Sequence, residues 1–443
     1  MHLVWENLIP NLVSLWSGDF KGLDLAQGDG DSPFVIPRDL WAELGDICVS
    51  ANKTIPSAFG AALPNIATDR NLFTAEMWAN FTLYLAPALL RERFRDSRYY
   101  KHFLHLVELL KICLQFEYST SDVKTVRDGF AQWVKDYEKL YYQYDPERLS
   151  MCPLTLHALL HVGDSMEYSA PVWAAWEFPT ERYCGILIPA VKSRRFPYAS
   201  LNQYAVDIAQ LSQIALRYDI EQELSLCRPH RALDEHAELR RTLQVADYPK
   251  AVLLAPHREQ QIPTAVHTKL AQCLATRFNV TMAVARRHVP HTLHQWGKVQ
   301  RTDGGDMIHA ADLVPRSESG RDATYVRYQL LVDKYARIHN RPPEYEPRDY
   351  HGQLRNVYVV DLPASDELGT TSPSTLLLAA IRTVSTVRAL DLAMPFYRKE
   401  GVLEVVDLAA VQCVVGRVFD VRRNWWAIID RSGPYAQAEF IDD

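Results

Sequence analysis

The chain has 443 residues, of which 48% are hydrophobic, 23% charged and 11% aromatic. This composition excludes a disordered tail, a collagen-like fibre and a small disulfide scaffold, and the length fits about three domains. The formal net charge of −6 argues against a protein whose whole surface coats nucleic acid. A local basic face remains compatible with that charge.

The opening segment, MHLVWENLIPNLVSLW, has neither the basic start nor the continuous apolar run of a secretory signal. The longest apolar stretch, Phe81 to Leu90, is too short to span a bilayer. Seven cysteines form no CxxC pair and fit no structural zinc site. We therefore expect an intracellular chain with reduced thiols and no membrane contact.

The first half of the chain has the apolar spacing of amphipathic helices. Apolar residues recur at i, i+3, i+4 and i+7, which predicts helices over Trp78–Phe94, Tyr99–Phe116 and Val123–Tyr144. The expected N-caps are Thr74 and the pair Ser121 and Asp122. Helical character continues to residue 218, so residues 1–225 are predicted to form a helical, insertion-like domain.

The second half changes its pattern. Residues 226–250 are charged and predict a linker, and residues 251–295 predict a short helical unit with two amphipathic helices. Alternating apolar and polar residues then predict strands over Thr324–Val332, Leu354–Val360, Thr375–Val384, Leu403–Val406, Val411–Val418 and Trp425–Ile429. The chain is thus predicted as α+β, a helical N-terminal half followed by a small, β-rich, barrel-like C-terminal domain over 296–443.

Common catalytic motifs are absent from the sequence, which has no GxSxG elbow, no GxxxxGK[ST] loop and no HExxH. His157 and His161 are four residues apart and would share one helix face. They could hold a metal together, but two ligands do not close a site. Two hydrogen-bonded histidines on an apolar helix are the favoured interpretation.

Residues 171–204 combine aromatic, acidic and basic side chains. Glu177 and Glu181 lie among the aromatic residues Trp173, Trp176, Phe178 and Tyr183. Downstream, basic residues alternate with aromatic ones at Lys192, Arg194, Arg195, Phe196 and Tyr198. Such a mixture can neutralise phosphates and stack on bases. The alternative is a tryptophan-rich core edge beside a solvated basic turn, with the arginines stacked on the aromatic cluster.

This stretch resembles the domain that follows the catalytic core in CACTA-type (En/Spm) DNA transposases. There, an apolar helix with two histidines precedes GPV-x-x-W, then W/F-x-F/Y-P-x-ERY/F-x-G, then a basic K-x-R-x-P-x-x-S. The matching residues here are His157, His161, Pro171, Val172, Trp176, Phe178, Pro179, Glu181, Arg182, Tyr183, Gly185, Lys192, Arg195, Pro197 and Ser200. The chain start is similar to the family's MH-(L/I)-x-x-N motif at Met1, His2, Leu3 and Asn7, and residues 350–431 look like the family's small terminal β domain.

The resemblance implies the chemistry of cut-and-paste DNA transposition. In the intact family, two Asp and one Glu of an RNase H-like core hold two divalent ions, normally Mg²⁺. Glu181 is the implied third carboxylate, and His2 is the motif residue beside the second Asp, whose position precedes Met1. Each Mg²⁺ needs several oxygen ligands. We therefore expect this chain alone to hold no complete metal site, to bind no cofactor and to cut no DNA.

The implied partner is transposon-end DNA, which would place the protein in the nucleus. The DNA-contact candidates are Arg182, Lys192, Arg194, Arg195, Phe196 and Tyr198. An alternative of the same ancestry is a domesticated interaction module, binding DNA or chromatin without chemistry, in which the β-rich domain binds a protein partner. Whether the protein is an enzyme stays open, because the aspartates that would decide it lie outside the sequence.

Overall fold

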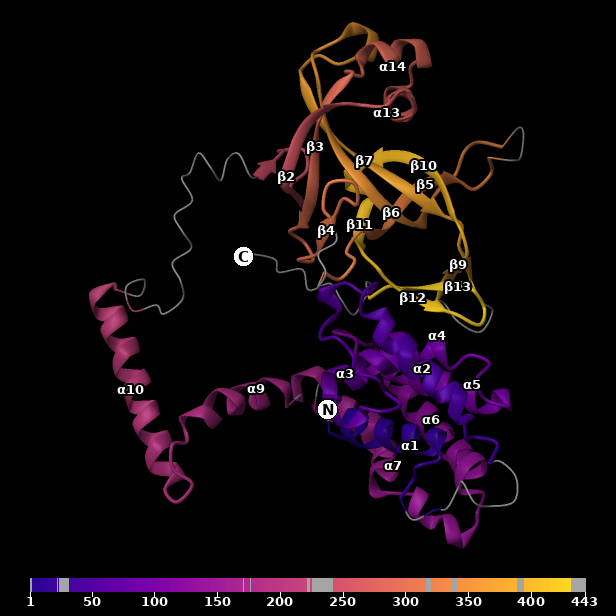
Figure 1. The fold of residues 1–443 in the computed structure, drawn as a ribbon, viewed down its shortest axis with the longest axis vertical. Helices are drawn as coiled ribbons and strands as arrows, with labels where there is room; N and C mark the ends of the chain where they lie inside the picture. Colours follow the sequence, from indigo (N-terminus) through magenta and orange to yellow (C-terminus); the bar gives the residue numbers. More distant parts are fainter. Residues whose placement is uncertain are drawn as a thin grey trace.

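The structure is a computed structural model and describes residues 2–21, 23, 32–169, 171–175, 177–220, 224, 242–315, 320–336, 341–388 and 394–431. Met1, Trp176 and most of the expected linker lie outside these residues. Within them the architecture is α+β, with a helical N-terminal half and a curled antiparallel sheet in the C-terminal half (Figure 1). The fold class expected from the sequence is therefore confirmed.

The helical half is a bundle of helices that pack around a common hydrophobic core. Its α-helices are α1 (Ile9–Ser17), α2 (Arg38–Ala51), α3 (Ala75–Asn80), α4 (Ala86–Leu89), α5 (Ser97–Cys113), α6 (Thr120–Tyr137), α7 (Leu154–Ala158) and α8 (Val162–Ser169). The π-helical and 3₁₀ turns are η1 (Val4–Leu8), η2 (Ser57–Phe59), η3 (Arg70–Leu72), η4 (Phe81–Leu85), η5 (Glu138–Tyr142), η6 (Pro146–Met151), η7 (Leu159–His161) and η8 (Val172–Ala175). The three long helices predicted from the apolar spacing correspond to α3–α4, α5 and α6.

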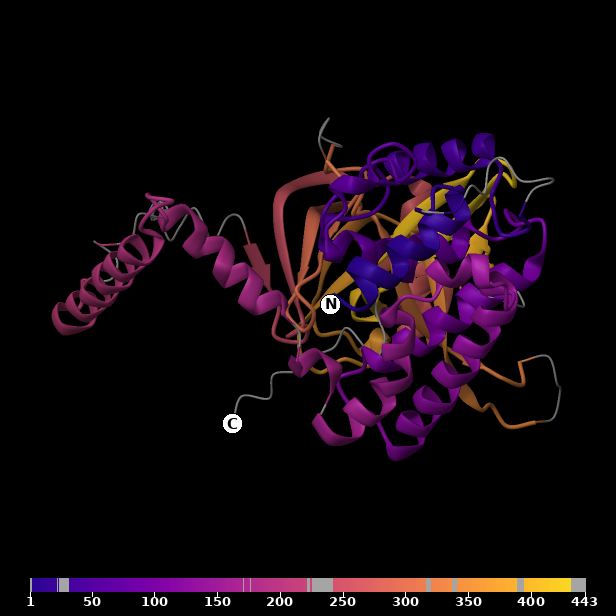
Figure 2. The same cartoon turned by 90° about the horizontal axis from the view of Figure 1, so that it is seen from below.

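Two further helices leave this bundle and form an arm. The arm consists of α9 (Phe178–Leu187), η9 (Ile188–Ala190) and α10 (Pro197–Tyr218). Both ribbon views show it extending away from the rest of the molecule (Figures 1 and 2). The apolar periodicity in this part of the chain therefore does not indicate burial in the helical core. No helix in the described ranges is long and apolar enough to cross a membrane.

The C-terminal half contains two antiparallel sheets. The larger follows the order β1 (Thr242–Gln244), β2 (Ala251–Gln261), β3 (Thr292–Arg301), β6 (Tyr345–Leu362), β5 (Tyr325–Asp333) and β11 (Val411–Val414). Off this path, β4 (Met307–His309) pairs with β3, and β7 (Ser374–Val384) pairs with β6 and with β10 (Glu400–Asp407). The smaller sheet contains β12 (Gly416–Asp420), β13 (Trp425–Ile429), β9 (Pro395–Tyr397) and β8 (Val387–Arg388). Short turns η10 (Asp366–Leu368) and η11 (Leu408–Ala410) connect strands.

The sheet starts earlier in the chain than the sequence pattern indicates. The region 251–295, expected to be a short helical unit, opens with the eleven-residue strand β2. Its two expected helices are present as α13 (Thr264–Phe278) and α14 (Met282–His288), inserted between β2 and β3. Leu270 of α13 and Ala285 of α14 belong to one buried cluster with Tyr358 and Leu376 of the sheet. The unit is thus part of the β-rich half.

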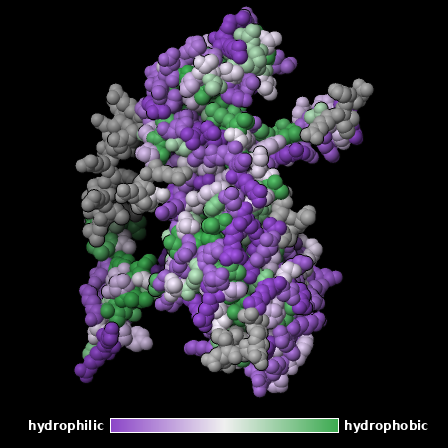
Figure 3. Space-filling model, turned by 45° about the vertical axis from the view of Figure 1, so that its right-hand side comes forward, coloured by the Kyte–Doolittle hydropathy of each residue, from purple (hydrophilic) through white to green (hydrophobic). Residues whose placement is uncertain are grey.

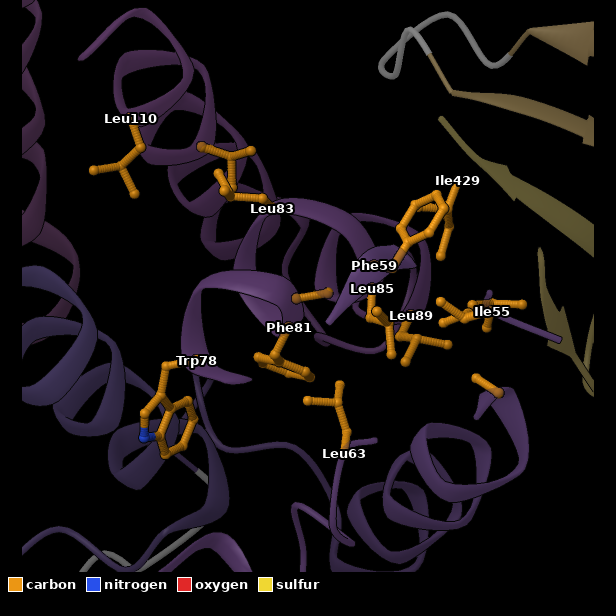
Figure 4. Packing of buried hydrophobic residues seen from close by; sticks show 14 of the residues in the cluster. Ile55, Phe59, Leu63, Trp78, Phe81, Leu83, Leu85, Leu89, Leu110 and Ile429 are labelled. Atoms are coloured by element: carbon orange, nitrogen blue, oxygen red, sulfur yellow. The ribbon is translucent and has the colours of Figure 1, made fainter. Parts of the chain in front are cut away.

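The two halves share one hydrophobic core rather than being separate bodies on a linker. Ile55 and Phe59 of the helical half lie beside Ile429 of β13 (Figure 4). A buried ion pair crosses the same boundary, with Arg93 Nη2 3.1 Å from Asp420 Oδ1. Thr54 Oγ1 also donates a hydrogen bond to the Arg417 carbonyl at 2.5 Å. This boundary fixes the β-rich half on the helical bundle.

Candidate functional site

The two motif residues expected to belong to one site are brought together. His2 precedes η1, and Glu181 lies in the first turn of α9. His2 Nε2 lies 3.2 Å from Glu181 Oε1. Both side chains are about half exposed. The fold therefore joins the opening segment of the chain to the base of the arm through the two residues that the resemblance singles out.

Neighbours in the opening segment orient His2. Its Nδ1 pairs with Glu6, one helical turn further along the chain, and its carbonyl accepts a hydrogen bond from Asn7 Nδ2 at 2.6 Å. A protonated imidazole can donate to Glu6 and Glu181 at once, whereas the neutral ring has a single N–H to donate. Positioned in this way, the ring connects two carboxylates. Glu6 did not emerge from the sequence, although the i, i+4 spacing from His2 is the signal that could have identified it.

The local ligand set does not fit a complete Mg²⁺ site. Mg²⁺ needs near-octahedral oxygen coordination, and two-metal sites need carboxylates that bridge both ions. Glu181 offers two oxygens, and one of them faces His2. Across the described residues, no group of three or more His, Cys, Asp or Glu side chains could hold a metal ion.

The basic candidates lie on the arm. Arg182 follows Glu181 in α9, and Lys192, Arg194 and Arg195 occupy the connection between η9 and α10. All four side chains are exposed. Within the described ranges none of them forms an ion pair, so their charges are not neutralised by those residues. From Glu181 to Lys192 the chain runs roughly 15 Å along α9 and η9.

The aromatic residues of the arm are also exposed. Phe196 and Tyr198 face solvent, and Arg195 lies over the Phe196 ring with Cζ 5.4 Å from its centroid. The alternative in which the arginines stack on the tryptophan cluster is not what the described residues show. Trp173 instead packs edge-on against Phe116, with ring centroids 5.8 Å apart. The basic connection is therefore available to an external partner.

The two histidines contact each other, as the sequence interpretation expects, and they do so on the exposed side of the helix. His157 Nε2 and His161 Nε2 lie 3.3 Å apart, so the two rings do meet. Both side chains are exposed, however, and do not belong to the apolar face of the helix. The reason is that Leu156 and Leu159 provide the buried face of this segment, which turns the histidines outward.

Comparison of the chain with protein-family models, with curated proteins and with solved structures finds no match in any of the three.

Proposed function

We propose that this protein is derived from a cut-and-paste DNA transposase and corresponds to the C-terminal region of the CACTA-type enzymes, catalytically incomplete as this chain stands. The observation that carries the proposal is the 3.2 Å approach of His2 Nε2 to Glu181 Oε1. These residues belong to two separate motifs that a transposase needs in one active site. A role on DNA would place the protein in the nucleus.

In this proposal Glu181 is the third carboxylate of the metal site, and His2 positions it. The aspartates come from sequence upstream of His2, which would have to approach the same place. The chain alone contributes the orientation of the glutamate through the imidazole contact.

The arm would hold the DNA backbone beside that site. Lys192, Arg194 and Arg195 are exposed, close together and free of ion pairs with described residues. Cations of this kind contact phosphates and position a protein on the duplex without reading base sequence. Phe196 and Tyr198 are exposed beside them and could stack on unpaired bases at a processed end.

The test of this DNA contact measures the affinity for a DNA duplex at several salt concentrations. Fluorescence anisotropy of a labelled duplex reports the binding. If each cation of the trio meets one phosphate, log K falls with log salt by about 0.9 per contact, or about 3 for the three. Replacing Lys192, Arg194 and Arg195 by Ala should reduce the slope by that amount for unrelated sequences alike. A matched control replaces the exposed lysines Lys101, Lys124 and Lys135 of α5 and α6, which removes the same charge elsewhere.

An unchanged slope together with a lowered melting temperature would show that the trio is structural, and would remove the DNA-contact part of the proposal. An equal loss in the control triple variant would mean that only net charge matters. The catalytic part is tested separately, by sequencing the genomic flank. Aspartate-bearing sequence in the same transcript would complete the site, and its absence would favour the domesticated interaction module.

A further inference from the structure

Helix α10 is a long amphipathic helix without a partner among the described residues. It has 22 residues, spanning about 33 Å, and none of them is buried. Large apolar side chains such as Ile208, Leu211 and Leu216 face solvent. In the space-filling view, hydrophobic residues gather on the projecting arm (Figure 3). Soluble monomers rarely expose an apolar surface of this extent.

The apolar residues of α10 follow a heptad pattern. Intervals of three and four residues alternate along one line of positions, which are Leu201, Tyr204, Ile208, Leu211, Ala215 and Tyr218. This is the a/d pattern of a coiled coil, in which the line of apolar residues faces a partner helix. A helix that only covers a globular core shows a wider apolar stripe. The pattern therefore points to another helix as the partner of α10.

The geometry points to α10 of a second copy of this chain as that partner, in an antiparallel two-helix coiled coil. The a/d series is symmetric about its centre, between Ile208 and Leu211. An antiparallel second copy therefore places Leu201 opposite the partner's Tyr218, Tyr204 opposite the partner's Ala215, and Ile208 opposite the partner's Leu211. In the layer of Tyr204 and Ala215 a large side chain meets a small one, as tight packing requires. A parallel pair would instead set Tyr204 against itself and Ala215 against itself.

The charge of the helix is compatible with self-pairing. Asp207 and Arg217 are the charged residues of α10, and they carry opposite signs. Neither occupies an a or d position. Beside the apolar line, Ala205 and Ser212 are small and let a second backbone approach closely. No residue of the apolar line, which we call the seam, carries a charge that would repel an identical helix. A partner that is recognised by its charge would need charged residues along the sides of the seam.

The first test measures the mass of the full chain in solution by light scattering over a dilution series. The wild type should dissociate from twice its mass of 50.7 kDa to the monomer. Ile208→Asp should be monomeric throughout, because it puts a charge in the central layer. The matched control is Val206→Asp, since Val206 is 49% exposed and Ile208 44%, but Val206 points away from the seam. The control should dimerise like the wild type.

The second test determines the orientation of the helices. Leu201→Glu and Tyr218→Lys, made singly, should each weaken the dimer. In the antiparallel pair the double variant sets Glu against Lys in both end layers, so it should dimerise more tightly than either single variant. In a parallel pair it would set like charges together and dimerise more weakly than both.

A wild type that stays monomeric would overturn the inference, and so would a dimer that survives Ile208→Asp or loses stability equally in Val206→Asp. Circular dichroism of each variant separates these results from misfolding. No misfolding is expected, because Val206, Ile208 and Tyr218 are exposed in the monomer and Leu201 is partly exposed. The measurements contain no DNA, so their outcome is independent of the proposed function.

Discussion

His2 and Glu181 lie in contact, with Nε2 3.2 Å from Oε1, although one residue opens the chain and the other begins the arm. The contact fastens the base of α9 to the segment before η1. A second carboxylate, Glu6, binds the other nitrogen of the same ring. The imidazole therefore bridges two carboxylates and holds Glu181 in place at the base of the arm.

The purified chain is expected to show no Mg²⁺- or Mn²⁺-dependent cleavage or strand transfer of DNA. The reason is that Glu181 is a single carboxylate and a two-metal site needs several. The measurement is nicking of a supercoiled plasmid with each metal, using wild type and Glu181→Gln in parallel. Metal-dependent nicking that disappears in Glu181→Gln would contradict this expectation, because it would require a complete site in the chain.

The buried ion pair between the two halves should matter for stability. Arg93 and Asp420 are both buried, with their nitrogen and oxygen 3.1 Å apart. Asp420→Ala should lower the free energy of unfolding by about 3 kcal/mol, since it removes one of the two carboxylates beside the buried guanidinium and leaves only Glu43, 3.3 Å from Arg93 Nη1. Urea denaturation measures the change.

The control for this substitution is an exposed ion pair of the β-rich half. Glu344 Oε1 lies 3.5 Å from Lys334 Nζ at the surface. Glu344→Ala should change the free energy of unfolding by at most about 1 kcal/mol. Equal effects of the two substitutions would mean that the helical and β-rich halves are not coupled through Arg93 and Asp420.

Local sequence signals predicted the regular elements well. Thr74 caps α3 as expected, with its Oγ1 accepting from Met77 N. The cap of α6 is Ser119 rather than Ser121, because Ser119 and Asp122 form a reciprocal capping box that the shorter spacing cannot make. Strand β13 has the predicted bounds Trp425–Ile429. In these elements, the local backbone preference of the sequence and the burial of its apolar side chains favour the same secondary structure.

Strand β2 shows where local signals fail. Its first residues are buried and apolar, but the stretch from Pro256 to Gln261 is polar and exposed. Without an apolar alternation, that stretch has the pattern of a loop or linker, and only pairing with β3 makes it a strand. The contact of His2 with Glu181 is likewise tertiary, and no spacing within the sequence encodes it. The motif resemblance implies that the two residues belong to one site, but it does not predict a contact between them.

Two glycines should respond oppositely to alanine. A Cβ on Gly352 of β6 would lie 2.6 Å from the Arg382 carbonyl oxygen of β7, so Gly352→Ala should cost about 1–3 kcal/mol. A Cβ on Gly185 of α9 meets no described atom within 4 Å. Gly185→Ala should raise stability by about 0.5–1 kcal/mol through the better helix propensity of alanine. Urea midpoints that shift in the same direction for both would refute this reading of the two environments.

Stability should also fall in mildly acidic solution because of His102. Burial in α5 lowers the pKa of His102 from 6.5 to about 4. The ring stacks on Trp133, with centroids 4.3 Å apart, and Nε2 donates to the Trp133 carbonyl at 3.0 Å. The folded state thus keeps a neutral imidazole in a range where the unfolded chain takes up a proton.

The sign of the effect follows from that difference in proton uptake. Above pH 6.5 both states hold a neutral ring, so His102 adds no pH dependence. Between pH 6.5 and about 4 the unfolded state binds more protons, and the free energy of unfolding decreases as the pH falls. From pH 7 to pH 5 the loss amounts to about 2 kcal/mol.

His102→Phe should remove this part of the pH dependence, while its stability at pH 7 is lower because the hydrogen bond to Trp133 is gone. Urea unfolding at pH 7, 6 and 5 measures the slope for wild type and variant. His161→Gln, which removes an exposed imidazole from the same half, controls for the loss of one histidine. If His102→Phe and the wild type lose the same free energy between pH 7 and 5, the acid sensitivity arises elsewhere and His102 is not the buried neutral group described here.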